Sequence, residues 1–380
     1  MRRQLTSPPA PYDYLLILNV LALILLGLLM VTSASITVSA QELHQPFHYF
    51  FRQMIYLIAG CGIGAIIMQF EIETWEHYSW LFLILALLFL TLVIIPGVGR
   101  SVNGSMRWIG AGPLGFQVSE FAKLAMIIYM SAYLWRHNEE IKTELSGFLK
   151  PMGILAVISL LLLKEPDFGA LVVITVTTLG LMFLAGMKIQ HFIALFAAAL
   201  AGLSALAISA PYRLARLTSF MNPWAHPFDS GYQLTQSLIA FGRGGWWGVG
   251  LGKSIQKLFY LPEAHTDFLF AVIAEELGLI GTLFVIALFA LLVLRVFKIG
   301  RRAQELGKHF AGFMAYGFAM WIAIQFVVSI GVNSGILPTK GLTLPFMSYG
   351  GSSLLINCMM IALVLRIDYE NRVSELGFQE

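Results

Sequence analysis

The sequence predicts an all-α integral membrane protein of ten transmembrane helices, with a large extracytoplasmic loop between helices 7 and 8. Three observations support this prediction. Hydrophobic residues make up 58% of the chain and charged residues only 12%, whereas soluble domains carry roughly a quarter charged residues. Mean hydropathy is +0.78. Apolar runs long enough to cross a bilayer recur along the whole chain, and the basic residues divide unevenly between the loops that join them.

Each apolar run is interpreted as a helix, because a helix of roughly 20 residues spans the hydrocarbon core. The first run lacks the short apolar core and the small-residue cleavage site of a signal peptide, so we interpret it as an uncleaved membrane anchor. The ten predicted spans are 14–34, 54–70, 78–96, 116–135, 151–165, 168–187, 191–210, 267–297, 310–333 and 348–366.

The distribution of basic residues predicts the orientation. An even number of spans places both termini on one side. The loops on that side hold thirteen Lys and Arg residues, against five in the short loops of the other side. Because basic residues concentrate in cytoplasmic loops, both termini are predicted to be cytoplasmic. The domain prediction is a cytoplasmic tail over 1–13, one ten-span membrane domain over 14–368 that includes the long loop 211–266, and a cytoplasmic tail over 369–380.

Most of the unusual residues lie in the predicted extracytoplasmic loops. A loop as long as 211–266 without a domain of its own is usually functional, so the functional face is predicted on that side. The other loops of interest read "GVGRSVNGSMRWIGAGPLGFQVSE", "KEPDFGA" and "NSGILPTKGLTLPFMSYGGSS".

Three acidic positions could belong to a site, and each also has a structural interpretation. Glu120 and Lys123 lie three residues apart, on one face of a helix. They are either an ion pair that neutralises two costly groups or a functional pair, and in both cases they should face the bundle interior. Asp167 follows a proline between two apolar runs and reads first as a helix cap.

Asp267 is predicted in the first turn of the eighth span, behind Thr266 as N-cap. An acid in a first turn is ordinary. It would also lie near the headgroups, where a general base acting on a lipid-linked pyrophosphate substrate would be needed. Glu275 and Glu276 lie about two turns deeper, ~12 Å along the axis, and read as buried pairing or packing groups.

Other motifs exclude some classes of function. "FGRGGWWGVGLGKS" lacks the glycine spacing of a phosphate-binding loop. It suits a tight turn with Trp246 and Trp247 as an interfacial anchor, and leaves Arg243, Lys253 and Lys257 open to contact a lipid phosphate. The eight histidines are scattered without metal-binding spacing. The dispersed net charge of +3 argues against nucleic-acid binding.

Taken together, four segments resemble the SEDS family (shape, elongation, division and sporulation), and its division-type members more than its elongation-type members. The resemblance covers residues 12–372 in order. One departure is Val118, where the family usually has proline. The segments are "RWIGAGPLGFQVSEFAK", "EPDFGA", "NPWAHPFDSGYQLTQSLIAFGRGGWWGVGLGKSIQKLFYLPEAHTDFLFAVIAEELG" and "LPTKGLTLPFMSYGGSS".

The resemblance implies a septal peptidoglycan glycosyltransferase that polymerises lipid II (undecaprenyl-pyrophosphate-linked disaccharide-pentapeptide) in the bacterial cytoplasmic (inner) membrane. Asp267 would be the catalytic carboxylate. Glu120 and Lys123 would form a polar pair in the cavity, and Asp167 would be a further acid there. Arg107 and Trp108 would lie near the entrance. The implied partners are a class B penicillin-binding transpeptidase and the divisome regulatory subcomplex.

Inversion at the anomeric carbon, from an α-linked pyrophosphate to a β-1,4 bond, fits direct displacement with one base and positive groups for the leaving pyrophosphate. Asp267 would be the base. A divalent cation held by the acids could share the stabilising role, and the sequence leaves this open. The candidate leaving-group stabilisers are Lys123, Arg107, Arg243 and Lys340.

Three other functions stay open at this point. An elongation-type polymerase would use the same site. A lipid II flippase or transporter would also keep buried charges in a multi-span bundle, but should place polar groups along a path to both faces. A scaffold would only recruit the transpeptidase. The concentration of polar residues on one face favours the polymerase.

Overall fold

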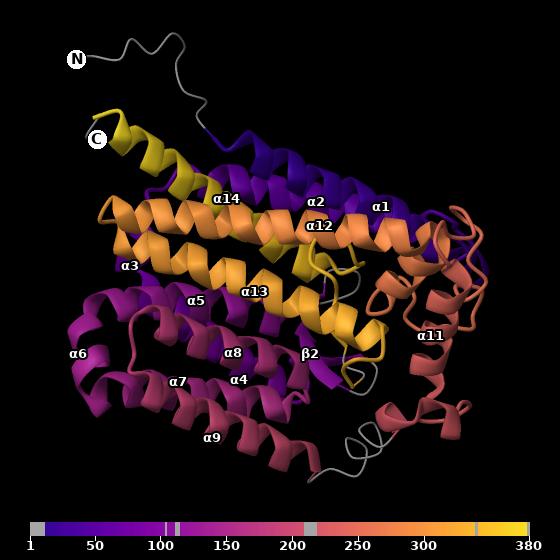
Figure 1. The fold of residues 1–380 in the computed structure, drawn as a ribbon, viewed down its shortest axis with the longest axis horizontal. Helices are drawn as coiled ribbons and strands as arrows, with labels where there is room; N and C mark the ends of the chain where they lie inside the picture. Colours follow the sequence, from indigo (N-terminus) through magenta and orange to yellow (C-terminus); the bar gives the residue numbers. More distant parts are fainter. Residues whose placement is uncertain (1–11, 103–104, 111–114, 209–218, 339–340, 378–380) are drawn as a thin grey trace.

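The computed structural model describes residues 12–102, 105–110, 115–208, 219–338 and 341–377. Long helices run side by side through most of the molecule (Figure 1). The helices are α1 (Tyr14–Glu42), α2 (His48–Ile67), α3 (Ile72–His77), α4 (Ser79–Ile94), α5 (Val118–Arg136), α6 (Asn138–Thr143), α7 (Leu145–Lys164), α8 (Phe168–Leu184), α9 (Ile189–Ile208), α11 (Tyr232–Gly244), α12 (Leu269–Glu305), α13 (His309–Asn333) and α14 (Gly351–Glu375), with a 3₁₀ turn η1 (Pro223–Ala225).

The prediction of a helical multi-span membrane protein is confirmed, and every predicted span contains a helix. Within the described ranges, six helices are long and apolar enough to cross a membrane, namely α1, α2, α7, α12, α13 and α14. The helices α4, α8 and α9 are apolar but shorter. Helix α14 continues to Glu375, nine residues past the predicted end of the last span.

A small antiparallel sheet was not predicted. Strands β1 (Gly99–Val102), β2 (Ser105–Ile109) and β3 (Phe116–Gln117) pair in the order β1-β2-β3. The prediction of a helical fold did not include this sheet, because such short strands among glycines give little periodic signal. Strand β2 packs on α4 and carries Arg107 and Trp108.

The two ends of the described chain meet. Arg295 on α12 donates to Asp13, the N-cap of α1, at 2.7 Å, and the rings of Tyr12 and Tyr369 lie 5.8 Å apart. We call this the terminus end of the bundle. Helix α11 and strand β2 lie at the opposite end (Figure 1), which we call the loop end.

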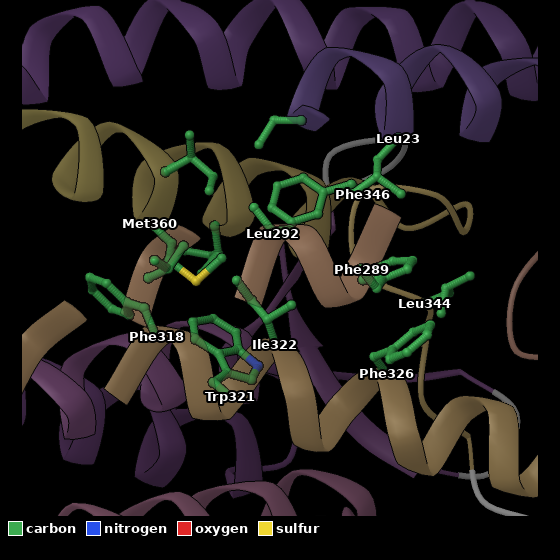
Figure 2. Close-up of a cluster of buried hydrophobic side chains, with 14 of the residues drawn as sticks. Leu23, Phe289, Leu292, Phe318, Trp321, Ile322, Phe326, Leu344, Phe346 and Met360 are labelled. Carbon is green, nitrogen blue, oxygen red and sulfur yellow. The ribbon is translucent and has the colours of Figure 1, made fainter. Parts of the chain in front are cut away.

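Two apolar clusters hold the helices together. One joins α1, α12, α13 and α14 and includes Leu344, Phe346 and Met347 of the segment before α14. Figure 2 shows its centre, where Phe289, Trp321 and Phe346 come from three different parts of the chain. The other cluster joins α4, α5, α7 and α8. Helices α5 and α13 pack on each other at the boundary of the two clusters, where polar residues are buried.

Candidate functional site

Asp167 is held at the start of α8 by several donors. One carboxylate oxygen accepts the backbone N–H of Ala170 at 3.1 Å, which confirms the predicted cap. The other accepts the hydroxyl of Ser119 at 2.8 Å and the amide of Gln117 at 3.4 Å. Arg107 lies 3.9 Å from Asp167. Asp167 therefore both caps α8 and belongs to a polar cluster.

Arg107 is fixed from strand β2. Its guanidinium donates to the backbone carbonyls of Glu165 at 3.1 Å and Pro166 at 2.5 Å. These bonds hold the α7–α8 turn against the sheet. The side chain of Arg107 stays 24% exposed, so its charge remains reachable from solvent at the loop end.

Glu120 and Lys123 form a buried ion pair on α5, as predicted. The Lys123 ammonium lies 2.9 Å from Glu120, and only 1% of its side chain is exposed. It also donates to Gln325 on α13 at 3.0 Å and lies 4.8 Å from the ring centre of Trp321. A cavity of only about 10 Å³ adjoins Lys123, too small for more than one water. Lys123 is therefore enclosed by protein and acts through the residues that it contacts.

Residues 341–344 connect this pair to Asp267. The amide of Gln325 donates to the carbonyl of Thr343 at 2.8 Å. A Cβ added to Gly341 would lie only 2.8 Å from a carboxylate oxygen of Asp267, so the bare backbone of Gly341 is in contact with this carboxylate. A side chain at position 341 would displace it. Asp267 and the Glu120–Lys123 pair therefore contact one short segment.

Asp267 precedes α12 instead of lying in its first turn. The helix begins at Leu269, and its first N–H groups receive no cap from the preceding side chain. Asn333 of α13 supplies the cap, since its oxygen accepts the N–H of Ala271 at 3.0 Å while its amide donates to the carbonyl of Asp267 at 2.9 Å. The predicted cap, Thr266, bonds to Glu263. The cap prediction was wrong because a partner distant in sequence took the role.

Arg243 belongs to a second polar cluster. Its guanidinium lies 3.0 Å from Glu275, and Lys257 lies 2.6 Å from Glu276. Both glutamates are fully buried, which fits the expectation of pairing groups. The structure thus places Arg243 on Glu275, eight residues beyond Asp267 in the chain.

Three further predictions concern Trp108, Lys340 and a bound metal ion. Trp108 lies beside Arg107 on β2, with its ring against Gly115. Lys340 lies outside the described residues. Within the described part of the chain, no three His, Cys, Asp or Glu side chains come close enough to hold a metal ion.

Sequence reasoning missed Gln325, Asn333 and Ser119. A signal for the first two exists, because Gln325, Ser329 and Asn333 recur every four residues in an apolar span and therefore share one helix face. Such a polar stripe inside a membrane helix marks a buried functional or pairing face. Ser119 adjoins Glu120 and carries no signal of its own.

Glu165, in the turn after α7, was also missed. It is fully buried, and neither of its carboxylate oxygens has a hydrogen-bond partner among the described residues. Burial, together with the charge of Asp167, raises the pKa of Glu165 to about 8, and Arg107 opposes this shift. Burial therefore favours the neutral form of this carboxyl group.

We expect Glu165→Gln to remove a pH dependence of stability. The folded protein keeps the Glu165 proton that the unfolded chain releases near pH 4.5, so the free energy of unfolding falls between that pH and about 8. The slope is at most about 1.4 kcal/mol per pH unit. Thermal unfolding in detergent from pH 5 to 9 should show a flatter curve for the variant. Parallel curves would contradict the assignment.

Comparisons with known proteins bear on the whole chain. The FtsW/RodA/SpoVE family model, described as a cell cycle protein, matches residues 13–373. A "Probable peptidoglycan glycosyltransferase FtsW" of Legionella pneumophila is 54% identical over 377 residues, 99% of this chain and 96% of that protein. A protein of the same name from Coxiella burnetii is 54% identical over 359 residues, 94% of this chain and 96% of that protein.

Solved structures agree. One chain from a study of "Structural coordination of polymerization and crosslinking by a peptidoglycan synthase complex" has a TM-score of 0.79 at 28% identity, over 95% of this chain and 98% of that chain. The rod shape determining protein RodA of Thermus thermophilus has a TM-score of 0.70 at 27% identity, over 97% and 98%. The match over nearly the whole length and the identity above one half make this chain a member of the FtsW/RodA/SpoVE family, the SEDS family.

Proposed function

We propose that this chain is a septal peptidoglycan glycosyltransferase that polymerises lipid II into β-1,4 glycan strands. The observation that carries the proposal is the connected set of buried polar groups at the loop end. Asp167 and Ser119 lie at the start of this set, Glu120 and Lys123 follow on α5, and residues 341–343 lead on to Asp267. Relatives at 54% identity carry the name of this activity.

In the proposed reaction Asp267 accepts the proton of the acceptor 4-hydroxyl. The hydroxyl oxygen then bonds to the anomeric carbon of the donor, and the bond to the pyrophosphate breaks with its electron pair leaving on the undecaprenyl pyrophosphate. Arg107 is the exposed cation of the set and would stabilise the leaving charge. Lys123 is enclosed and would act by holding Gln325, which orders the segment that contacts Asp267.

Purified chain incubated with lipid II in detergent tests the activity. We expect glycan strands, resolved by gel electrophoresis after labelling. A transporter has no membrane to act across under these conditions and would leave lipid II unchanged, as would a scaffold. Unchanged lipid II in the presence of the cognate transpeptidase would overturn the proposal.

We also propose that the loop end faces the extracytoplasmic side, on the basis of the uneven Lys and Arg distribution. With Cys61 and Cys358 replaced by alanine, Asp229→Cys in the exposed loop before α11 should react in whole cells with a membrane-impermeant thiol reagent. Glu305→Cys, at the terminus end of α12, should react only after lysis. The reverse pattern would invert the placement of the site.

A class B penicillin-binding transpeptidase is the proposed partner, together with the divisome regulatory subcomplex, and the division septum is the proposed location. The structural relative with a TM-score of 0.79 comes from a peptidoglycan synthase complex that couples polymerization to crosslinking. A polymerase whose site lies at one end of its bundle can deliver glycan strands to a crosslinking domain on the same side of the membrane.

A further inference from the structure

Residues 245–260 have an inverted burial pattern. The polar side chains of Ser254, Gln256 and Lys257 are buried, while the apolar ones face outward. Trp247 is 81% exposed and Leu251 53%. A loop in water shows the opposite pattern, since lysine is almost never fully buried unless paired. The exposed apolar and aromatic residues, which we call the collar, are Trp246, Trp247, Leu251, Ile255, Leu258, Phe259 and Tyr260.

The buried polar groups have partners within the bundle. Lys257 lies 2.6 Å from Glu276 and donates to Ser33 of α1 at 2.8 Å. The hydroxyl of Ser254 donates to Glu275 at 2.5 Å. Because these contacts pair the charges internally, the segment can turn its apolar side outward without leaving charges unpaired in an apolar medium.

The collar is joined to α12 by backbone hydrogen bonds. Gly278 has non-helical angles, φ 67° and ψ −165°, which interrupt the helix. The N–H groups of Leu279 and Ile280 instead donate to the carbonyls of residues 245 and 246, and the N–H groups of residues 249 and 250 donate to the carbonyls of Glu275 and Glu276. Four bonds across the interruption thus replace the missing helical ones and fix the tryptophans beside it.

These glycines allow the two backbones to approach each other. A Cβ on Gly248 would lie 2.1 Å from the carbonyl oxygen of Glu276, and one on Gly244 2.0 Å from that of Ala274. Real Cβ atoms do not approach so closely. The repeated glycines of "GRGGWWGVG" therefore serve this contact, which confirms the tight-turn interpretation of the motif.

The outward-facing surface of α12 becomes apolar just after the interruption. The residues just after Gly278 are apolar and outward-facing, as Leu283 and Phe284 illustrate at 53% and 57% exposed. The next charged residues, Arg295 and Lys298, follow after ~26–30 Å of helix, which matches the hydrocarbon thickness of roughly 30 Å. The collar therefore continues the exposed apolar surface of α12 at the level of Gly278.

We infer that the collar is a lipid-contacting surface, embedded in the bilayer leaflet at the loop end, with Trp246 and Trp247 at the boundary between acyl chains and headgroups. Tryptophan is enriched at this boundary because one part of its ring system is apolar and its N–H is polar. The exposed Lys253 in the same segment can extend to lipid phosphates. This role rests on the proposed function: in the polymerase, the collar sets the position of Asp267 along the membrane normal, relative to the lipid headgroups.

Spin labels test the inference without measuring activity. In a background lacking Cys61 and Cys358, nitroxides are placed at Trp247→Cys and Ile255→Cys, with Leu283→Cys as lipid-facing control and Asp229→Cys as water-facing control. In phosphatidylethanolamine–phosphatidylglycerol nanodiscs, we expect a several-fold higher ratio of oxygen to nickel-chelate accessibility at 247 and 255 than at 229. Ratios equal to that at 229 would overturn the inference.

A second measurement uses the unaltered chain, in case the variants do not fold. Vesicles of the same lipids carry a diazirine on the acyl chain, and crosslinked peptides are mapped by mass spectrometry after illumination. We expect adducts within 245–260. Adducts confined to the helices would overturn the inference.

Discussion

Asp267→Asn is expected to abolish glycan synthesis from lipid II while leaving the protein folded. Removing a general base typically costs ~100- to 10,000-fold in rate. The structure separates this from a capping effect, because Asn333 and not Asp267 caps α12, and Asn333 donates to the backbone carbonyl of Asp267, which the substitution keeps. The variant should therefore express, insert and bind the transpeptidase as the parent does. Initial rates of lipid II polymerisation give the measurement.

The matched control is Asp229→Asn, which removes an exposed acid from the same long loop. It should polymerise at the parental rate. This result would show that the loss of a negative charge from the loop does not by itself reduce the polymerisation rate. Polymerisation by Asp267→Asn within about tenfold of the parent would remove Asp267 from the role of base. Asp167 and Glu120 would then be the next acids to replace.

Lys123→Met should reduce both stability and activity. The substitution leaves Glu120 buried beside an uncharged side chain, and breaking a buried pair by removing one partner typically costs ~3–5 kcal/mol. It also removes one of the two donors to the side-chain oxygen of Gln325, leaving that of Trp321, and so loosens the residue that holds Thr343 in the segment that contacts Asp267. Thermal unfolding and polymerisation assays on the same preparation measure the two effects.

A double substitution separates the two effects. Glu120→Gln combined with Lys123→Met leaves no unpaired charge, so we expect most of the lost stability to return. Activity should stay low, because the contact of the ammonium with Gln325 is still missing. Full activity of Lys123→Met alone would show that the pair has only a structural role.

The helical architecture could be predicted from the sequence because lipid imposes a simple rule. A spanning segment must satisfy its own backbone hydrogen bonds, so long apolar runs become helices. The sheet at 99–117 escaped prediction because its strands are too short to give a periodic signal. The start of α12 escaped prediction because its backbone is paired by a residue distant in sequence, as with Asn333 and Ala271, and no local pattern encodes such a partner.

The candidate site was predicted in part. Costly charges in apolar surroundings drew attention to Glu120, Lys123, Asp167 and Asp267, since each needs a partner or a function. What joins them could not be predicted, because Gln325, Thr343 and Gly341 are ordinary residues individually. Arg243 was grouped with the site by charge alone, whereas the structure pairs it with Glu275.

The packing of α2 on α14 has a consequence for biogenesis. Gln53 of α2 bonds the backbone at Ser348 and Gly350, just before α14, yet about 280 residues separate the two helices. At synthesis rates of roughly 5–20 residues per second, α2 is made on the order of 15 to 60 s before its partner. During this interval the inserted N-terminal helices lack their packing partner and must be shielded by lipid or by the insertion machinery. In a chain that stops before α14, the N-terminal helices would stay without this packing partner. Assembly of the whole bundle is therefore complete only after the last helix has been inserted.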